Sequence, residues 1–213
     1  MPLSDLQVRV ASILLAIPEA DGFALAGGAA LIFYDITDRA TQDIDCFGPT
    51  PDAVDRLHPA AVAALEAAGL RTQTQQQGPG FARLRVTSGP DETLLDLGFD
   101  PARRPPLPTP LGAVRALDDL AGDKLLALFS RAEPRDFLDV AGLLRRYRRT
   151  ELETFAAAKD LGFNRSVLAD AFGVLPTIRR DRFDVDDATY TELLETFRTW
   201  RADLDANRRE GAP

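Results

Sequence analysis

The sequence has very few of the residues on which several kinds of catalytic site depend. Its 213 residues include one cysteine, Cys46, and one histidine, His58. A single cysteine excludes an internal disulfide and suits a reducing compartment. A single histidine excludes a histidine-rich zinc site and argues against a histidine base, so we expect His58 on the surface of a helix. The chemistry of this chain must therefore rest on other side chains.

Long apolar runs are also missing. No apolar stretch reaches the roughly 18 residues that a membrane-spanning helix requires, and the N-terminal segment lacks the layout of a signal peptide. We therefore expect a cytoplasmic protein that does not associate with membranes.

Basic charge is scarce overall, and lysine is especially rare. The formal net charge is −8, and arginine outnumbers lysine 23 to 2. An acidic chain is a poor general ligand for nucleic acid, so we expect no DNA partner and only local contacts with RNA. The arginine groups in residues 145–149 and 179–182 could hold an RNA backbone, although solvated helix faces explain them equally well.

Residues 23–47 are the most informative stretch. A short apolar run reaches Gly27 and Gly28, a helix-compatible segment follows, and Asp43 and Asp45 then lie in a strand-like run. Two carboxylates one residue apart on a strand point to the same face, where they repel each other unless a cation lies between them. A glycine pair between a strand and a helix can receive a phosphate. Together these features predict metal-assisted nucleotidyl transfer.

Two sequence blocks carry a resemblance to a known family. Residues 27–31 read GGAAL, and residues 39–45 read RATQDID. They resemble the G-G-[ST]-A-L and R-x-[ST]-x-D-[IL]-D patterns of the AbiEii/AbiGii and MenT toxin family, within the DNA polymerase β-like nucleotidyltransferase superfamily. Ala29 departs from the pattern and lacks the usual hydroxyl. The resemblance implies nucleotide contacts at Gly27, Gly28, Arg39 and Thr41.

Thr41 has two interpretations. It lies two residues before Asp43, so on a continuing strand both side chains would point to the metal side. Alternatively, its hydroxyl bonds to the adjacent backbone.

A third carboxylate is expected on a later strand. Residues 70–77 and 81–88 read as a hairpin, and the apolar run 93–99 that follows contains Asp96. A lone acid among leucines is costly unless it is paired or binds a metal. The superfamily resemblance implies a third metal ligand at this place, for which Asp96 is preferred and Asp100 is the alternative.

The chain is expected to have two parts. Residues 101–110 contain five prolines and read as a linker without regular structure. With this boundary, the resemblance implies an α+β fold, with a polymerase β-like nucleotidyltransferase core over residues 1–110. This core would be a small mixed sheet with flanking helices, and a helical bundle would follow over residues 111–213. Helices in this second part are predicted at 117–130, 135–148, 151–161, 164–173 and 187–207.

The helical part contains a second family pattern, K-L-x-A-L-x-x-R-x-x-x-R-D-x-x-D, over residues 124–139. In the family, the lysine that corresponds to Lys124 contacts the triphosphate, and Asp136 belongs to the functional set. The structural alternatives are a surface lysine at Lys124, and at Asp136 a helix-start acid that pairs with Arg131 or Arg135.

The sequence thus predicts a Mg²⁺-dependent nucleotidyltransferase. The resemblance implies a toxin that transfers a nucleotide from an NTP to an RNA acceptor, such as a tRNA 3′ end, and that has a cognate antitoxin. A small-molecule nucleotidyltransferase of the antibiotic-modifying kind and a non-catalytic nucleotide-binding module are the alternatives. The expected catalytic residues are Asp43, Asp45, Asp96, Lys124 and Asp136, of which the first three would hold the metal.

Overall fold

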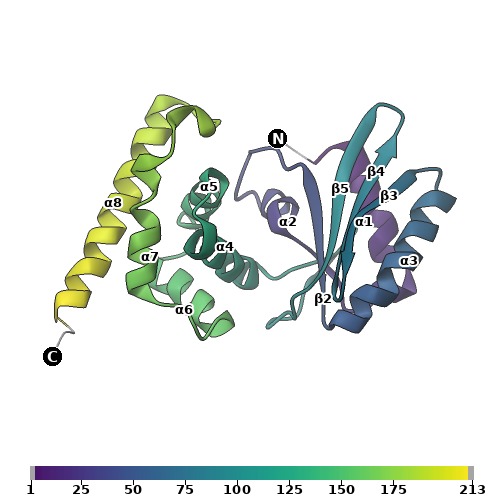
Figure 1. Ribbon diagram of the computed structural model, residues 1–213, viewed down its shortest axis with the longest axis horizontal. Coiled ribbons are helices and arrows are strands. Elements are labelled where there is room, and N and C mark those ends of the chain that lie inside the picture. Colours follow the sequence, from purple (N-terminus) through teal and green to yellow (C-terminus); the bar gives the residue numbers. More distant parts are fainter. Residues whose placement is uncertain (1–2, 211–213) are drawn as a thin grey trace. The chain divides into compact units, whose positions relative to one another are not determined.

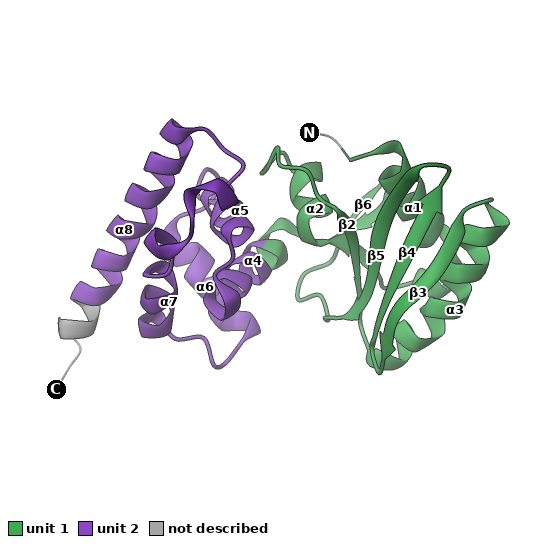
Figure 2. Ribbon diagram, turned by 45° about the horizontal axis from the view of Figure 1, so that its top comes forward, with its two compact units in different colours: residues 1–120 green, residues 121–213 purple. Residues whose placement is uncertain are grey.

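The chain forms two compact units. A computed structural model describes residues 3–210, and its units comprise residues 1–120 and 121–213 (Figure 2). The first unit therefore extends beyond residue 110, where the sequence suggested a boundary. Strands and helices occur together, which confirms the α+β class. The bundle arrangement of the second part stays a prediction.

The first helix begins at a serine that caps it. Ser4 precedes α1 (Asp5–Ala16), and its hydroxyl accepts a hydrogen bond from the backbone N–H of Gln7 at 3.2 Å. The Gln7 side chain accepts in return from the backbone N–H of Ser4 at 2.9 Å. This reciprocal capping satisfies donors that the helix cannot satisfy internally.

Seven strands of the first unit form one mixed sheet, in the order β3-β4-β5-β2-β1-β7-β6. The β2–β5 and β1–β7 pairs are parallel, and the other pairs are antiparallel. The strands are β1 (Ala24–Ala26), β2 (Asp43–Gly48), β3 (Arg71–Gly78), β4 (Phe81–Ser88), β5 (Asp91–Phe99), β6 (Leu107–Thr109) and β7 (Gly112–Val114).

Helices cover the sheet unequally. The helix α3 (Pro51–Ala67) packs with α1 on one face, whereas α2 (Gly27–Phe33) lies on the other face against β1 and β2 (Figure 1). The expectation for His58 is wrong, because its side chain is buried between α3 and the sheet. Its Nε2 lies 3.0 Å from the Thr74 hydroxyl of β3, which satisfies its polar edge.

The proline-rich segment is only partly irregular. Residues 107–109 form β6, which pairs with β7, and β7 continues the sheet beside β1. The interpretation of residues 101–110 as a structureless linker is therefore wrong for these three residues. Pro108 is tolerated because β6 is the last strand of the sheet, where an absent N–H donor leaves no neighbouring strand unpaired.

The second unit is organised around aromatic side chains. The rings of Phe137 and Phe197 meet edge to face, with their centroids 5.0 Å apart, and Trp200 lies 4.9 Å from Phe172. The indole Nε1–H of Trp200 donates to Glu153 at 2.9 Å. The helices are α4 (Leu117–Arg131), which begins in the first unit, α5 (Pro134–Leu143), α6 (Arg149–Lys159), α7 (Arg165–Phe172) and α8 (Asp187–Glu210).

Across residues 3–210, none of the helices combines the length and the apolar character needed to span a lipid bilayer.

Candidate active site

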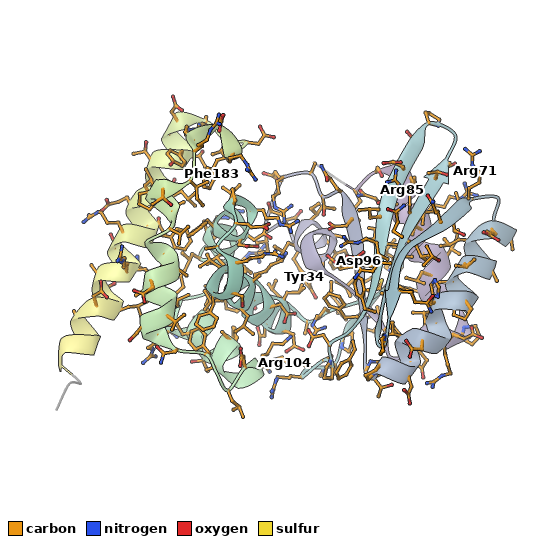
Figure 3. All side chains as sticks on the ribbon, viewed as in Figure 1. Tyr34, Arg71, Arg85, Asp96, Arg104 and Phe183 are labelled. Atoms are coloured by element: carbon orange, nitrogen blue, oxygen red, sulfur yellow. The ribbon has the colours of Figure 1, made fainter. Side chains whose placement is uncertain are left out.

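Two adjacent parallel strands bring three carboxylates together. Asp43 and Asp45 lie one residue apart on β2, and Asp96 on β5 pairs in register with Asp45. Their side chains therefore share one face, and one oxygen from each lies within 4.8 Å of the others. Figure 3 shows Asp96 on the side of the sheet that faces away from α1 and α3. Asp96 is far from Asp43 and Asp45 in the sequence, yet the three aspartates form one cluster in the fold.

The opposite face of these strands fixes the cluster. Ile44 and Cys46 on β2 and Leu95 and Leu97 on β5 are fully buried. Their packing against the helices prevents the strands from sliding, because a slip of one residue would expose leucine to water. Burial raises the pKa of the Cys46 thiol well above its usual range, and the charge of Asp45 raises it further. Cys46 is therefore an inert core residue.

Arg83 is a residue of this site that the sequence reasoning missed. It lies on β4 directly opposite Asp96, and its Nε donates to Asp96 Oδ1 at 2.7 Å while its Nη2 donates to Oδ2. These hydrogen bonds raise the pKa of Arg83, and the charges of Asp43 and Asp45 add to the rise. The signal that could have found it is the turn at residues 89–90, because this turn sets the register between β4 and β5 that places Arg83 beside Asp96.

Gly27 leaves room for the Asp45 carboxylate. Its φ is +59°, and a Cβ built on it would lie 1.6 Å from Asp45 Oδ2. Both the left-handed backbone and the contact exclude any larger residue at this position. A glycine between β1 and α2 thus allows β1 and the Asp45 side chain to approach closely.

Gly28, Arg39 and Thr41 form a second close contact beside the cluster. A Cβ on Gly28 would lie 2.7 Å from the Thr41 hydroxyl oxygen and 3.3 Å from Arg39 Nη2. The Thr41 hydroxyl donates to Asp43 Oδ1 at 2.9 Å, and its backbone oxygen accepts from the Gln7 side chain at 2.9 Å. Thr41 therefore orients an Asp43 carboxylate oxygen. Its 3.3 Å contact with the Asp43 backbone oxygen agrees with the structural alternative as well.

Asp100 does not join the cluster. Its carboxylate pairs with Arg115 Nη2 at 2.8 Å, and the Arg115 side chain is only 1% exposed. Arg115 also donates to the backbone oxygens of Asp100 and Pro101 at 3.1 and 3.3 Å. Asp100 therefore anchors the chain after β5, and Asp96 is the acid that lies with Asp43 and Asp45.

In the second unit, Lys124 is a buried residue with an ionic partner. Its Nζ lies 2.9 Å from Asp139 Oδ2, and the two side chains are 11% and 1% exposed. The structural alternative of a surface lysine is therefore wrong.

Asp136 is fully buried at the start of α5. Arg131 donates to its two oxygens at 2.9 and 2.7 Å, and the backbone N–H of Glu133 donates to Oδ2 at 3.1 Å. The hydrogen bonds to Asp136 raise the pKa of Arg131. These contacts match the structural alternative in which Asp136 caps the helix and pairs with Arg131.

The cluster on β2 and β5 suits a hard divalent cation. All three side chains offer carboxylate oxygens, which Mg²⁺ prefers, and the oxygens are close enough to share an ion. Arg83 offsets part of their negative charge, so a cation would offset the remainder. The residues present thus fit a metal site.

Comparisons with known proteins show the family of the chain. The family described as "Nucleotidyl transferase AbiEii toxin, Type IV TA system" matches residues 11–210. No curated protein sequence matches the chain.

Solved structures share the fold at low sequence identity. The structure of JHP933 from Helicobacter pylori is 18% identical, with a TM-score of 0.57, and the match covers 98% of this chain and 97% of that one. MenT4, a nucleotidyltransferase toxin from Mycobacterium tuberculosis H37Rv, is 17% identical with a TM-score of 0.54. That match covers 96% of this chain and 86% of MenT4. With a family match over nearly its whole length, the chain belongs to the AbiEii family of nucleotidyltransferase toxins of type IV toxin–antitoxin systems.

Proposed function

We propose that this protein is a Mg²⁺-dependent toxin that transfers a nucleoside monophosphate from an NTP to the 3′ end of an RNA, such as a tRNA. The observation that carries the proposal is the convergence of Asp43, Asp45 and Asp96 in a chain of this family. Family membership implies a nucleotide substrate and an antitoxin partner. We expect the protein to act in the cytoplasm.

In the proposed reaction, the 3′-hydroxyl oxygen of the acceptor attacks the α-phosphorus of the NTP. The bond from that phosphorus to the β-phosphate oxygen breaks, pyrophosphate leaves, and the hydroxyl proton is lost to solvent or a nearby base. Asp43, Asp45 and Asp96 would hold Mg²⁺, which when bound lowers the hydroxyl pKa and offsets charge on the phosphates.

Other residues of the first unit would arrange this cluster. Thr41 directs one oxygen of Asp43 through its 2.9 Å hydrogen bond, and Gly27 keeps the space that the Asp45 carboxylate requires. We propose that Gly28 and Arg39, which lie side by side next to Thr41, face the phosphates. A guanidinium and free backbone N–H groups both suit phosphate oxygens.

The family resemblance implies two further residues of the proposed set. Lys124 would contact the triphosphate, and its ammonium group would then be shared between Asp139 and a phosphate. Asp136 would act indirectly, because Arg131 and the start of α5 use both of its oxygens.

The acceptor is tested directly by product analysis. The purified chain is incubated with each α-³²P-labelled NTP and either total tRNA or a panel of aminoglycoside and lincosamide antibiotics, with and without EDTA. Label in RNA that depends on Mg²⁺ is the expected result. Label in an antibiotic would favour the small-molecule alternative, and label in neither, with NTP still bound, would favour a non-catalytic module.

The toxin function has a separate test in cells. Expression in a bacterial host should arrest growth, whereas the Asp45→Asn variant at equal abundance should not. Equal growth of the two strains would contradict a toxic transferase.

A further inference from the structure

We propose that Arg83 is a positioning residue that takes the place of a cation beside Asp96 and competes there with the metal ion. The inference rests on the metal site of the proposed function, but not on the transfer reaction itself. Arg83 and Asp96 face each other across β4 and β5, so the backbone register holds them together. The guanidinium fork uses both Asp96 oxygens, through Nε to Oδ1 at 2.7 Å and Nη2 to Oδ2 at 2.5 Å.

The exposure of the two side chains fits an exchange between arginine and metal. The Asp96 side chain is 8% exposed and has little freedom to seek water, whereas the Arg83 side chain is 38% exposed and has open space into which it can withdraw. Because Arg83 donates to both Asp96 oxygens, a cation that approaches Asp43 and Asp45 meets Asp96 at an oxygen that already accepts from the arginine. Arg83 therefore assembles the cluster before metal arrives and also opposes the arrival.

These two effects have opposite signs, and their sizes decide the outcome. Loss of Arg83 would free the Asp96 carboxylate to rotate, which weakens metal binding by the cost of fixing one short side chain. The same loss would remove the repulsion between the divalent ion and the guanidinium, which would bind the same carboxylate. At a given distance, this repulsion is twice that between two unit charges. The electrostatic effect is the larger, so metal should bind more tightly without Arg83.

Turnover should change in the opposite direction. Asp96 without its fork would sample several orientations, and fewer molecules would hold the reacting groups in line. A residue that only supports the fold would weaken metal binding and turnover together.

The test titrates the protein with Mn²⁺ alone and measures free Mn²⁺ by electron paramagnetic resonance, so that no nucleotide or acceptor is required. Arg83→Gln should lower the Mn²⁺ Kd about fivefold, as expected for loss of a partly screened charge. Arg85→Gln is the matched control, because Arg85 lies two residues along the same strand and pairs with Glu92 at 3.0 Å. It should change the Kd less than about twofold.

Two further variants separate the effect of the Arg83 charge from that of its paired hydrogen bonds to Asp96. Arg83→Lys keeps the charge, so its Mn²⁺ Kd should stay near that of the wild type while turnover falls. In an Asp96→Asn background, Arg83→Gln should tighten Mn²⁺ binding much less, because a guanidinium without its carboxylate partner is no longer held beside the metal. Thermal unfolding in EDTA verifies that each variant is folded.

The outcomes distinguish this inference from the proposed function. An Arg83→Gln chain that binds Mn²⁺ no more tightly than the wild type overturns the inference, and so does an Arg83→Lys chain that matches Arg83→Gln. If neither the wild type nor the variant binds Mn²⁺, both proposals fall. If binding tightens as expected while no acceptor is ever labelled, only the proposed transfer reaction falls.

Discussion

The two units use aspartate in opposite ways. In the first unit, Asp43, Asp45 and Asp96 converge on one face of the sheet and place like charges within a few ångströms of one another. Arg83 pairs with Asp96 and offsets part of this charge, and the crowding of the three carboxylates favours a further cation.

In the second unit, each buried aspartate has its own cation. Asp136 receives the Arg131 fork, and Asp139 receives Lys124. The same residue type thus serves two purposes, since crowded carboxylates fit ligand binding, whereas separately paired carboxylates fit folding. If this comparison is correct, substitutions in the first cluster will affect chemistry, and those in the second will affect stability.

The largest expected effect is on the chemistry of the first cluster. Asp45→Asn should lower transfer by about 10³-fold or more, because a neutral amide is a poor metal ligand. Its melting temperature should stay the same or rise, since like-charge repulsion falls. Initial transfer rates and thermal unfolding in EDTA measure the two effects, and a large loss of stability would erase the distinction between the units.

The second prediction concerns stability in the second unit. Asp139→Asn should destabilise the protein by about 3 kcal/mol, because it leaves the Lys124 charge buried without a carboxylate. Urea unfolding measures the change. Asp203→Asn is the matched control, since its pair with Arg149 is largely exposed on the Asp203 side and its loss should cost less than about 1 kcal/mol. Equal losses for the two variants would contradict a special role for the buried pair.

The third prediction tests whether Lys124 both stabilises the fold and contacts the nucleotide. In the Lys124→Met/Asp139→Leu double variant, both buried charges disappear, so we expect much of the stability lost in Asp139→Asn to return. If Lys124 also contacts the triphosphate, the KM for NTP should remain about tenfold above that of the wild type. A stable double variant with wild-type kinetics would assign Lys124 to folding only.

The smallest expected effect concerns Cys46, which lies directly behind the cluster. Burial, followed by the charge of Asp45, raises the thiol pKa, so the reactive thiolate is scarcer at a given alkaline pH than in the unfolded chain. Alkylation by iodoacetamide at pH 8 should therefore be at least about tenfold slower in the native protein than in urea. Similar rates in the two conditions would mean that β2 opens readily and that the cluster is not rigid.

Local patterns in the sequence were sufficient for the elements around the site. Alternation along β2 placed Asp43 and Asp45 on one face of the sheet. The choice of Asp96 over Asp100 relied on the resemblance, because Asp96 lies within the apolar run and Asp100 directly follows it. Their roles are separated by the register of Asp96 with Asp45 and by the contact of Asp100 with Arg115, which lies on the far side of the proline-rich segment.

Features that depend on long-range packing were not accessible from local patterns. Arg83 looked like an ordinary polar residue of a hairpin. The turn at residues 89–90 sets its register, but its importance comes from Asp96 on the strand beside it. His58 was predicted to lie on the surface, and a surface lysine was the alternative for Lys124, since polar side chains on amphipathic helices are usually exposed. Their burial follows from Thr74 on β3 and Asp139 on α5, which lie elsewhere in the chain.

The parallel register between β2 and β5 also governs when a newly made chain becomes active. Asp45 meets Asp96 only after α3 and the β3–β4 hairpin have been synthesised and β5 has docked beside β2. A slip of one residue would place Leu95 or Leu97 opposite Asp45 and turn Asp96 to the other face. Half-made or mispaired chains would therefore lack a complete cluster, and a cell that synthesises this toxin would be exposed only to molecules whose central strands have joined correctly.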